Sequence, residues 1–155
     1  MQIVEKKITD VIPYENNPRY NDNAVDAVAK SIEEFGFQQP LVLDKDNVII
    51  VGHTRYKASL KLGLETVPCV IADKLSEEQI KAYRLVDNKV GELASWDFEV
   101  LETELLSIEN LNMMDFGFDE IENIDIDKFF EETQAPKEKK KKTITCPYCG
   151  EEIEL

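Results

Sequence analysis

The spacing of hydrophobic residues changes several times along the first ninety positions, and each spacing predicts a different element. Apolar and polar residues alternate over residues 2–8, which is typical of a half-buried strand. From Ala24 to Phe35 the apolar positions recur every three or four residues, which predicts a helix. Asn23 is the expected N-cap of this helix, and Gly36 is its expected stop.

The following region predicts a hairpin and then a helix, a strand and a helix. The short apolar runs "PLVLD" and "NVIIVG" lie on either side of an Asp-Lys-Asp-Asn turn and predict the hairpin. Ser76 and Gln79 have the spacing of a capping box. The remaining expected elements are a helix over residues 54–62 that ends at Gly63, a strand over residues 66–73, and a helix from Glu77 to about Asn88.

This order of elements predicts a small α+β domain with a mixed sheet and packed helices. Changes in composition then divide the chain. We expect the domain over residues 1–91, an acidic helical extension over 92–135, a lysine-rich linker over 136–142 and a short cysteine knuckle over 143–155. The apolar residues of the extension also lie at helical intervals, so we expect it to fold back onto the first domain.

Charge is distributed unevenly among these segments. The 155-residue chain has a formal net charge of -14, of which residues 1–91 contribute -2, residues 92–135 contribute -13 and residues 136–155 contribute +1. No basic face of the kind that binds duplex DNA is visible, so we do not expect the chain alone to bind DNA directly. The acidic extension is either the solvated face of ordinary helices or a protein-binding or DNA-mimicking surface.

Composition also indicates the compartment. Three cysteines, two of them in one CxxC, do not make a disulfide framework and fit a reducing environment. The first residues, MQIVEKKITD, lack the apolar run of a signal peptide. No stretch approaches the roughly 18 apolar residues of a membrane span. We therefore expect a cytoplasmic, intracellular protein without a membrane partner.

The stretch "NVIIVGHTRYKASLKLG" has the chemistry most suggestive of a binding site. An apolar strand ends at Val51, the chain turns at Gly52, and a helix follows. The first N–H groups of a helix have no internal partner, and together with the helix dipole they favour an anion. Arg55 adds a fork of donors, Thr54 adds a hydroxyl, and His53, the one histidine of the chain, adds a donor or a proton carrier. The combination suits a phosphate group.

A structural interpretation of the same residues stays open. In that interpretation Gly52 serves only the turn, Arg55 pairs with a carboxylate, and His53 is a structural or surface group. In the functional interpretation His53 neutralises phosphate charge or relays a proton near neutral pH, which makes it the candidate catalytic residue.

Several short motifs follow one another in a fixed order over residues 2–91. They are Ser31-Ile32, Gly36 to Leu41, Gly52 to Arg55, Ala58, Leu62-Gly63 and Val67-Pro68. The ordered set resembles the N-terminal domain of the ParB family, in the partition-protein and sulfiredoxin-like superfamily. Chains of phages and mobile elements, and the front ends of some DNA methyltransferases, are especially similar. They share the "GHTR" turn and a "DNK…E" segment, which is formed here by residues 87–89 with Glu92.

The resemblance implies a nucleotide site. In ParB the Gly-x-x-Arg turn holds the triphosphate of CTP, and a later Glu-Asn pair helps to place a magnesium ion. Magnesium prefers oxygen ligands and keeps several waters, which an Asp-Asn pair allows. Carried over to CTP or another nucleotide, the implied residues are Gly52, His53, Thr54 and Arg55 at the phosphates, Gln39 close by, and Asp87 and Asn88 near the magnesium ion.

The chain departs from the family at three points. ParB usually has an acidic residue followed by Arg where this chain has His53 and Thr54. Because that acid is tied to hydrolysis, the resemblance implies a weak nucleoside triphosphatase or no turnover. Sulfiredoxins place a reactive cysteine at the position of His53, so their redox activity is not expected. Partition proteins continue into a helix-turn-helix domain where this chain has its acidic extension.

The terminal "CPYCG" predicts a cysteine knuckle. Cys146 and Cys149 match half of a tetrahedral Zn²⁺ site, and zinc requires four ligands. Three interpretations stay open: a symmetric homodimer that joins two knuckles, a partner that supplies the missing ligands, or a degenerate remnant. Cys69 lies in an apolar strand and is expected in the core.

These observations together indicate a nucleotide-binding accessory of DNA partition, modification or regulation in a phage or mobile element. Its expected partner is a DNA-modification or partition protein. The alternatives are a small-molecule kinase or a nuclease on the same fold, and an adaptor that uses its acidic face without a nucleotide.

Overall fold

The computed structural model describes residues 2–118, 143–145 and 152–154. The chain divides into two compact units, Met1–Ile121 and Glu122–Leu155.

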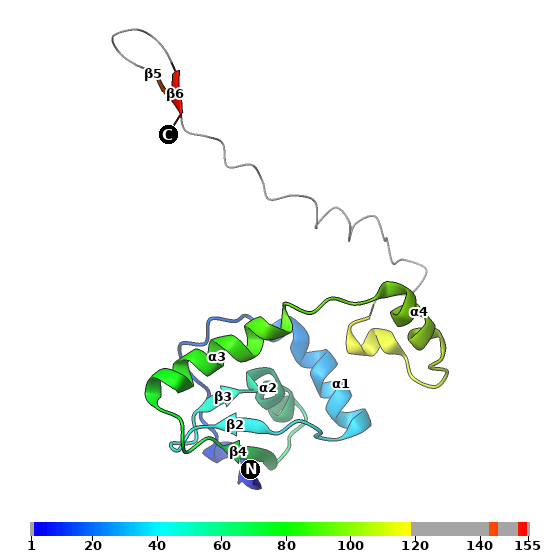
Figure 1. The fold of residues 1–155 in the computed structure, drawn as a ribbon. Coiled ribbons are helices and arrows are strands. Elements are labelled where there is room, and N and C mark those ends of the chain that lie inside the picture. The colour runs from blue at the N-terminus through cyan, green and yellow to red at the C-terminus, as the bar shows by residue number, and fades with distance from the viewer. Residues whose placement is uncertain (1, 119–142, 146–151, 155) are drawn as a thin grey trace. The chain divides into compact units, whose positions relative to one another are not determined.

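A mixed four-stranded sheet forms the centre of the first unit, in the order β1-β4-β2-β3. Figure 1 labels β2, β3 and β4 of this sheet. Strand β4 runs antiparallel to β1 and parallel to β2, and β2 runs antiparallel to β3. The predicted hairpin of β2 and β3 is confirmed, with an irregular register at Val42 and Leu43. The strands are β1 (Ile3–Lys7), β2 (Leu41–Leu43), β3 (Ile49–Val51) and β4 (Thr66–Ile71).

Helices pack against this sheet, and the predicted α+β class is confirmed. Helix α1 packs on α2, and α3 packs along β3. The helices are α1 (Val25–Phe35), α2 (His53–Lys61), α3 (Glu77–Gly91) and α4 (Phe98–Leu106), with the short 3-10 helices η1 (Ile8–Asp10), η2 (Asp22–Ala24) and η3 (Met113–Phe116). Within the described residues, none of these helices is long and apolar enough to cross a membrane.

The helix ends test the capping predictions. Asn23 is not the N-cap of α1, because it lies in the middle of η2, a 3-10 turn that runs directly into the helix. Ala24 takes that position without a capping side chain. Gly36 ends α1 with φ 75, as predicted. The capping box of α3 is confirmed: Ser76 Oγ accepts from the Gln79 N–H (3.3 Å), and Gln79 Oε1 accepts from the Ser76 N–H (2.9 Å).

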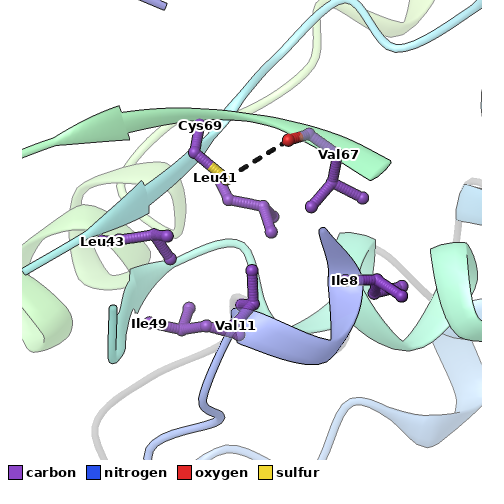
Figure 2. Packing of buried hydrophobic residues seen from close by; sticks show 7 residues of the cluster. All are labelled: Ile8, Val11, Leu41, Leu43, Ile49, Val67 and Cys69. Carbon is purple, nitrogen blue, oxygen red and sulfur yellow. Dashed lines mark hydrogen bonds between the residues drawn. The ribbon is translucent and has the colours of Figure 1, made fainter. Parts of the chain in front are cut away.

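The hydrophobic core lies between the sheet and η1, as Figure 2 shows. Its buried members are Ile8, Val11, Leu41, Leu43, Ile49, Val67 and Cys69. Cys69 is fully buried, which confirms its place in the core, and its thiol donates to the Val67 carbonyl at 3.5 Å. Burial raises the pKa of this thiol to about 11, so it stays protonated and unreactive at neutral pH.

The first part of the acidic extension belongs to the same compact unit. Asp97 caps α4 by accepting from the Val100 N–H (3.3 Å), and Leu105 of α4 is buried. The rings of Phe35 in α1 and Phe116 in η3 lie with their centroids 5.4 Å apart. This contact agrees with the expectation that the extension folds back. The helices expected over residues 119–135 and the linker over 136–142 lie outside the described residues.

The second unit contains one antiparallel pair, β5 (Thr143–Thr145) and β6 (Glu152–Glu154). Cys146 and Cys149 fall between these strands in the sequence and lie outside the described residues. Zinc binding at this position therefore stays a prediction.

Candidate functional site

The turn from β3 into α2 has the geometry that its sequence predicts. Gly52 has φ 107 and ψ 25, in the left-handed region that glycine enters at little cost. A Cβ at this position would lie 2.6 Å from Leu41 Cδ2, which is buried in the core. The first helical hydrogen bond runs from the Tyr56 N–H to the Gly52 carbonyl (2.9 Å), so the preceding N–H groups have no partner within the helix. No side chain caps them.

A cavity of ≈ 820 Å³ includes this turn in its wall. Ligand pockets commonly have volumes of about 300–1,000 Å³. The chain segments that line the cavity come from the loop before α1, from α1, from the approach to β2, and from the facing side of α3. All seven residues predicted for the nucleotide and magnesium are among them: Gln39, Gly52, His53, Thr54, Arg55, Asp87 and Asn88.

Arg55 lies in the cavity wall with part of its guanidinium already bound. Its Nη1 donates to the carbonyl of Gln39 (2.7 Å), to Gln39 Oε1 (3.3 Å) and to the carbonyl of Pro40 (3.3 Å). Burial lowers the pKa of Arg55, and the charge of Asp87 opposes this shift, yet a guanidinium stays charged at neutral pH. Among the described residues Nε and Nη2 have no acceptor, so these donors remain for a ligand.

His53 is held as a neutral imidazole. Burial lowers its pKa most, and the positive charges of Arg84 and Lys57 lower it further. Its Nε2 accepts from the Tyr14 N–H at 3.3 Å, which requires a ring nitrogen without a proton. We infer from this hydrogen bond that the proton is on Nδ1. At neutral pH His53 can therefore donate a hydrogen bond from Nδ1, but its ring carries no positive charge.

Thr54 is tied to the loop that precedes α1. Its Oγ1 accepts from Asn21 Nδ2 (2.9 Å). Lys57, one turn further along α2, donates to Asn21 Oδ1 (3.0 Å) and to Asp22 Oδ1 (2.6 Å). These bonds fix the loop beside the first turn of α2.

Asn88 connects α3 to the same loop. Its Oδ1 accepts from Arg19 Nη1 (2.7 Å), and its Nδ2 donates to the Arg84 carbonyl (2.9 Å). Arg84 is itself largely buried: its Nε donates to the Ile49 carbonyl (3.2 Å), and its guanidinium lies 3.8 Å from the centre of the Tyr14 ring. Arg84 therefore joins α3, β3 and the loop.

A magnesium ion would find few protein ligands here. Within the described residues no three His, Cys, Asp or Glu side chains form a group able to hold a metal ion. Magnesium often binds through one or two carboxylates together with substrate phosphates and waters, a set that Asp87 fits.

Sequence reasoning did not predict Arg19 and Asn21, which line the cavity, or Arg84, which supports Asn88 and Tyr14 beside it. Arg19 and Asn21 lie in "NNPRYN", whose Asn and Pro residues predict only a loop. The arginine inside that loop is the signal that could have marked a functional residue. Nothing in the local pattern around Arg84 marks it, because its partners Ile49, Asp44 and Tyr14 lie in β3, in the β2–β3 turn and in the loop.

The mixed sheet, the glycine turn and the cavity at the start of α2 define a class of small α+β domains with a polar pocket at a helix N-terminus. The family model of the ParB N-terminal domain matches residues 1–89. This match covers more than half of the chain, and the chain therefore belongs to the ParB N-terminal domain family.

Individual relatives agree with this family. The chain is 31% identical over 80 residues to the ParB-like nuclease domain-containing protein YnaK of Escherichia coli (strain K12). This match covers 51% of this chain and 92% of YnaK. The chain is 31% identical over 117 residues to the nucleoid occlusion protein of Bacillus cereus (strain B4264). That match covers 71% of this chain and 40% of the relative, so the chain spans less than half of the nucleoid occlusion protein.

One solved structure shares the fold at low sequence identity. It is the C-terminally truncated chromosome-partitioning protein ParB from Caulobacter crescentus, complexed with CTP-gamma-S. The TM-score is 0.57 at 19% identity, over 69% of this chain and 64% of that chain. At this identity the likeness shows the fold.

Proposed function

We propose that the cavity binds a nucleoside triphosphate, with CTP as the first candidate, and that the phosphates lie at the N-terminus of α2. The observation that supports this most is the arrangement at Gly52. Its left-handed turn presents the uncapped N–H groups of His53, Thr54 and Arg55 beside the guanidinium of Arg55, in the wall of one cavity. Backbone donors at a helix N-terminus and a nearby guanidinium together favour phosphate.

Family membership and the Caulobacter crescentus structure, whose ligand is CTP-gamma-S, support the choice of CTP. The proposed role is a nucleotide-binding accessory of DNA partition, modification or regulation, in a phage or mobile element. The "GHTR" turn and the "DNK" segment support that setting. His53 and Thr54 stand where the family usually has an acid and an arginine, so hydrolysis should be slow or absent.

Magnesium would bind chiefly through the phosphate oxygens of the nucleotide, with the carboxylate of Asp87 as a protein ligand. Asn88 is the second expected ligand. Its Oδ1 accepts from Arg19 Nη1 at 2.7 Å in this structure.

Isothermal titration tests this function directly. CTP, ATP and GTP would be titrated with and without magnesium into the wild type, Arg55→Ala and Arg55→Lys. The lysine variant keeps the charge but loses the planar fork that spans two acceptors. Lys45→Ala is the matched control, because Lys45 is an exposed cation in the β2–β3 turn and does not line the cavity.

One nucleotide should bind the wild type and Lys45→Ala equally well. Arg55→Ala should lose about 10- to 100-fold in affinity, as expected when a hydrogen bond to a charged group is removed. Because Arg55 also holds the Gln39 carbonyl, circular dichroism must show that the variant is folded. Equal affinity of the wild type and folded Arg55→Ala would contradict the proposed role of Arg55. A wild type that binds none of the three nucleotides would contradict the function.

A further inference from the structure

Helix α4 has apolar residues on two faces, and within the described part of the chain one of these faces is uncovered. Phe98, Leu101 and Leu105 recur at helical spacing and are partly or fully buried, so their face packs within the first unit. Val100 and Leu106 lie on the other side of the helix and are 56% and 64% exposed. Because the solvent side of a helix is normally polar, apolar side chains there indicate a contact surface.

The two polar residues on the same side of α4 have hydroxyls that are satisfied within the helix. Thr103 Oγ1 donates to the Glu99 carbonyl (3.0 Å), and Ser107 Oγ donates to the Glu104 carbonyl (2.6 Å). A partner that covered these residues would leave neither hydroxyl without a hydrogen bond, which is the main cost of burying such groups. Four residues thus form the α4 face: Val100, Thr103, Leu106 and Ser107.

The one tryptophan of the chain lies just before this helix. Trp96 is 63% exposed, and its ring meets the ring of Phe118 edge-on, with the centroids 6.2 Å apart. It precedes Val100 by four positions, which span at most about 14 Å, so one bound segment can touch both residues. Tryptophan is enriched among the residues that contribute most of the binding energy at protein interfaces.

Carboxylates surround the α4 face without cations to balance them. Residues 90–118 contain seven acidic residues and no lysine or arginine. On α4, Glu99, Glu102 and Glu104 each lie four positions from a member of the α4 face, which makes them its neighbours on the helix surface. None of these three carboxylates forms an ion pair with another described residue. The surface therefore combines exposed apolar side chains with uncompensated negative charge.

We propose that the α4 face, together with Trp96, binds a basic amphipathic helix of a partner protein. Apolar side chains of that helix would cover Val100 and Leu106, and its lysines or arginines would lie against the surrounding carboxylates. Charge argues against a second copy of this chain, because a symmetric contact would bring like carboxylates together. The residues that line the nucleotide cavity end at Asn88, so this surface is separate from the proposed nucleotide site.

The fluorescence of Trp96 tests the proposal, because the emission of an exposed indole shifts to shorter wavelength when the ring is covered. The probe is a synthetic helical peptide, about four turns long, with leucines on one face and lysines on the other. It would be titrated into the full chain at low and at high salt. One control peptide has the same residues in scrambled order, without an apolar face. A second control peptide has glutamates in place of the lysines.

The double variant Val100→Gln/Leu106→Gln removes the apolar part of the α4 face. Its affinity for the leucine–lysine peptide should fall about tenfold or more, because two side chains lose their apolar contacts with the peptide. Leu60→Gln is the matched control, since Leu60 is 51% exposed and lies on α2. This control should bind the peptide as the wild type does. Circular dichroism shows whether each variant is folded.

The double variant Glu102→Gln/Glu104→Gln tests the charge. It should lose about three- to tenfold in affinity for the leucine–lysine peptide at low salt, and much less at high salt, where surface charges are screened. Glu33→Gln/Glu34→Gln is the matched control, because it neutralises two exposed glutamates of α1. It should match the wild type at both salt concentrations.

Several results would overturn the inference while leaving the proposed function standing. A wild type that does not bind the leucine–lysine peptide, or that binds the scrambled peptide equally well, would show that the surface does not select an amphipathic helix. Unchanged affinity of folded Val100→Gln/Leu106→Gln would exclude the α4 face as the contact. Equal binding of the glutamate peptide would contradict the role of charge. A dimer in sedimentation that dissociates in Val100→Gln/Leu106→Gln would make a second copy the occupant.

Discussion

Replacing Gly52 by alanine should be the most damaging glycine substitution in the described part of the chain. Two separate costs meet at this position. A non-glycine residue held at φ 107 costs about 1–3 kcal/mol in backbone strain. The added Cβ would also lie 2.6 Å from Leu41 Cδ2, and overpacking of a core adds about 1–3 kcal/mol. The sum is about 2–6 kcal/mol, a large share of the roughly 5–15 kcal/mol that stabilises a typical domain.

Two other glycines separate these costs. Gly63 has φ 67 with no atom within 4 Å of an added Cβ, so Gly63→Ala should show backbone strain alone, about 1–2 kcal/mol. Gly91 lies in α3 with a negative φ and open space around it, so Gly91→Ala should stabilise the protein by about 0.5–1 kcal/mol.

Urea unfolding followed by circular dichroism measures the three free energies of unfolding. From the most to the least stable protein, the expected order is Gly91→Ala, wild type, Gly63→Ala and Gly52→Ala. A Gly52→Ala variant as stable as Gly63→Ala would refute the predicted clash between the added Cβ and Leu41 Cδ2. An unfolded Gly52→Ala would lie at the upper end of the expected range.

Three further outcomes follow from the described contacts. Ser76→Ala removes the capping box of α3 and should lower the free energy of unfolding in urea by about 1 kcal/mol. An unchanged urea midpoint would show that this cap is not needed. Folding lowers the pKa of His53, so just below pH 6.5 the unfolded chain binds more protons than the folded one, and the free energy of unfolding should fall as the pH drops from above 6.5 toward the folded pKa. Urea unfolding at pH 7 and pH 5 should show a smaller fall in His53→Gln than in the wild type. Cys69, whose buried thiol has a pKa of about 11, should resist iodoacetamide at pH 8 in the folded protein and react with it in urea. Peptide mapping by mass spectrometry would measure this labelling, and rapid labelling of Cys69 without urea would contradict its burial.

Features that depend on neighbouring residues were predictable from the sequence. The stop of α1 at Gly36 and the capping box at Ser76 involve contacts within four positions, and both are present. The N-cap at Asn23 failed for a local reason as well. A 3-10 turn precedes α1, and an Asn before a helical period looks the same whether or not such a turn is present.

Long-range features were not predictable from local pattern. The position of β4 between β1 and β2 depends on pairing across more than twenty residues. The bond from Tyr14 to His53 spans 39 positions, and it decides which nitrogen of the imidazole can donate. The resemblance to ParB supplied the candidate residues of the cavity, but it did not indicate that Asn88 holds Arg19 or that Gln39 holds Arg55.

The central claim is that the N–H groups at the start of α2 bind phosphate. Amide chemical shifts in a ¹H–¹⁵N spectrum of the full chain, recorded during titration with CTP and magnesium, test it most directly. If these N–H groups bind phosphate, the amides of residues 52–55 should shift most, and tripolyphosphate should produce the same pattern at higher concentration. Shifts confined to other parts of the chain, or an unchanged spectrum at millimolar CTP, would contradict it.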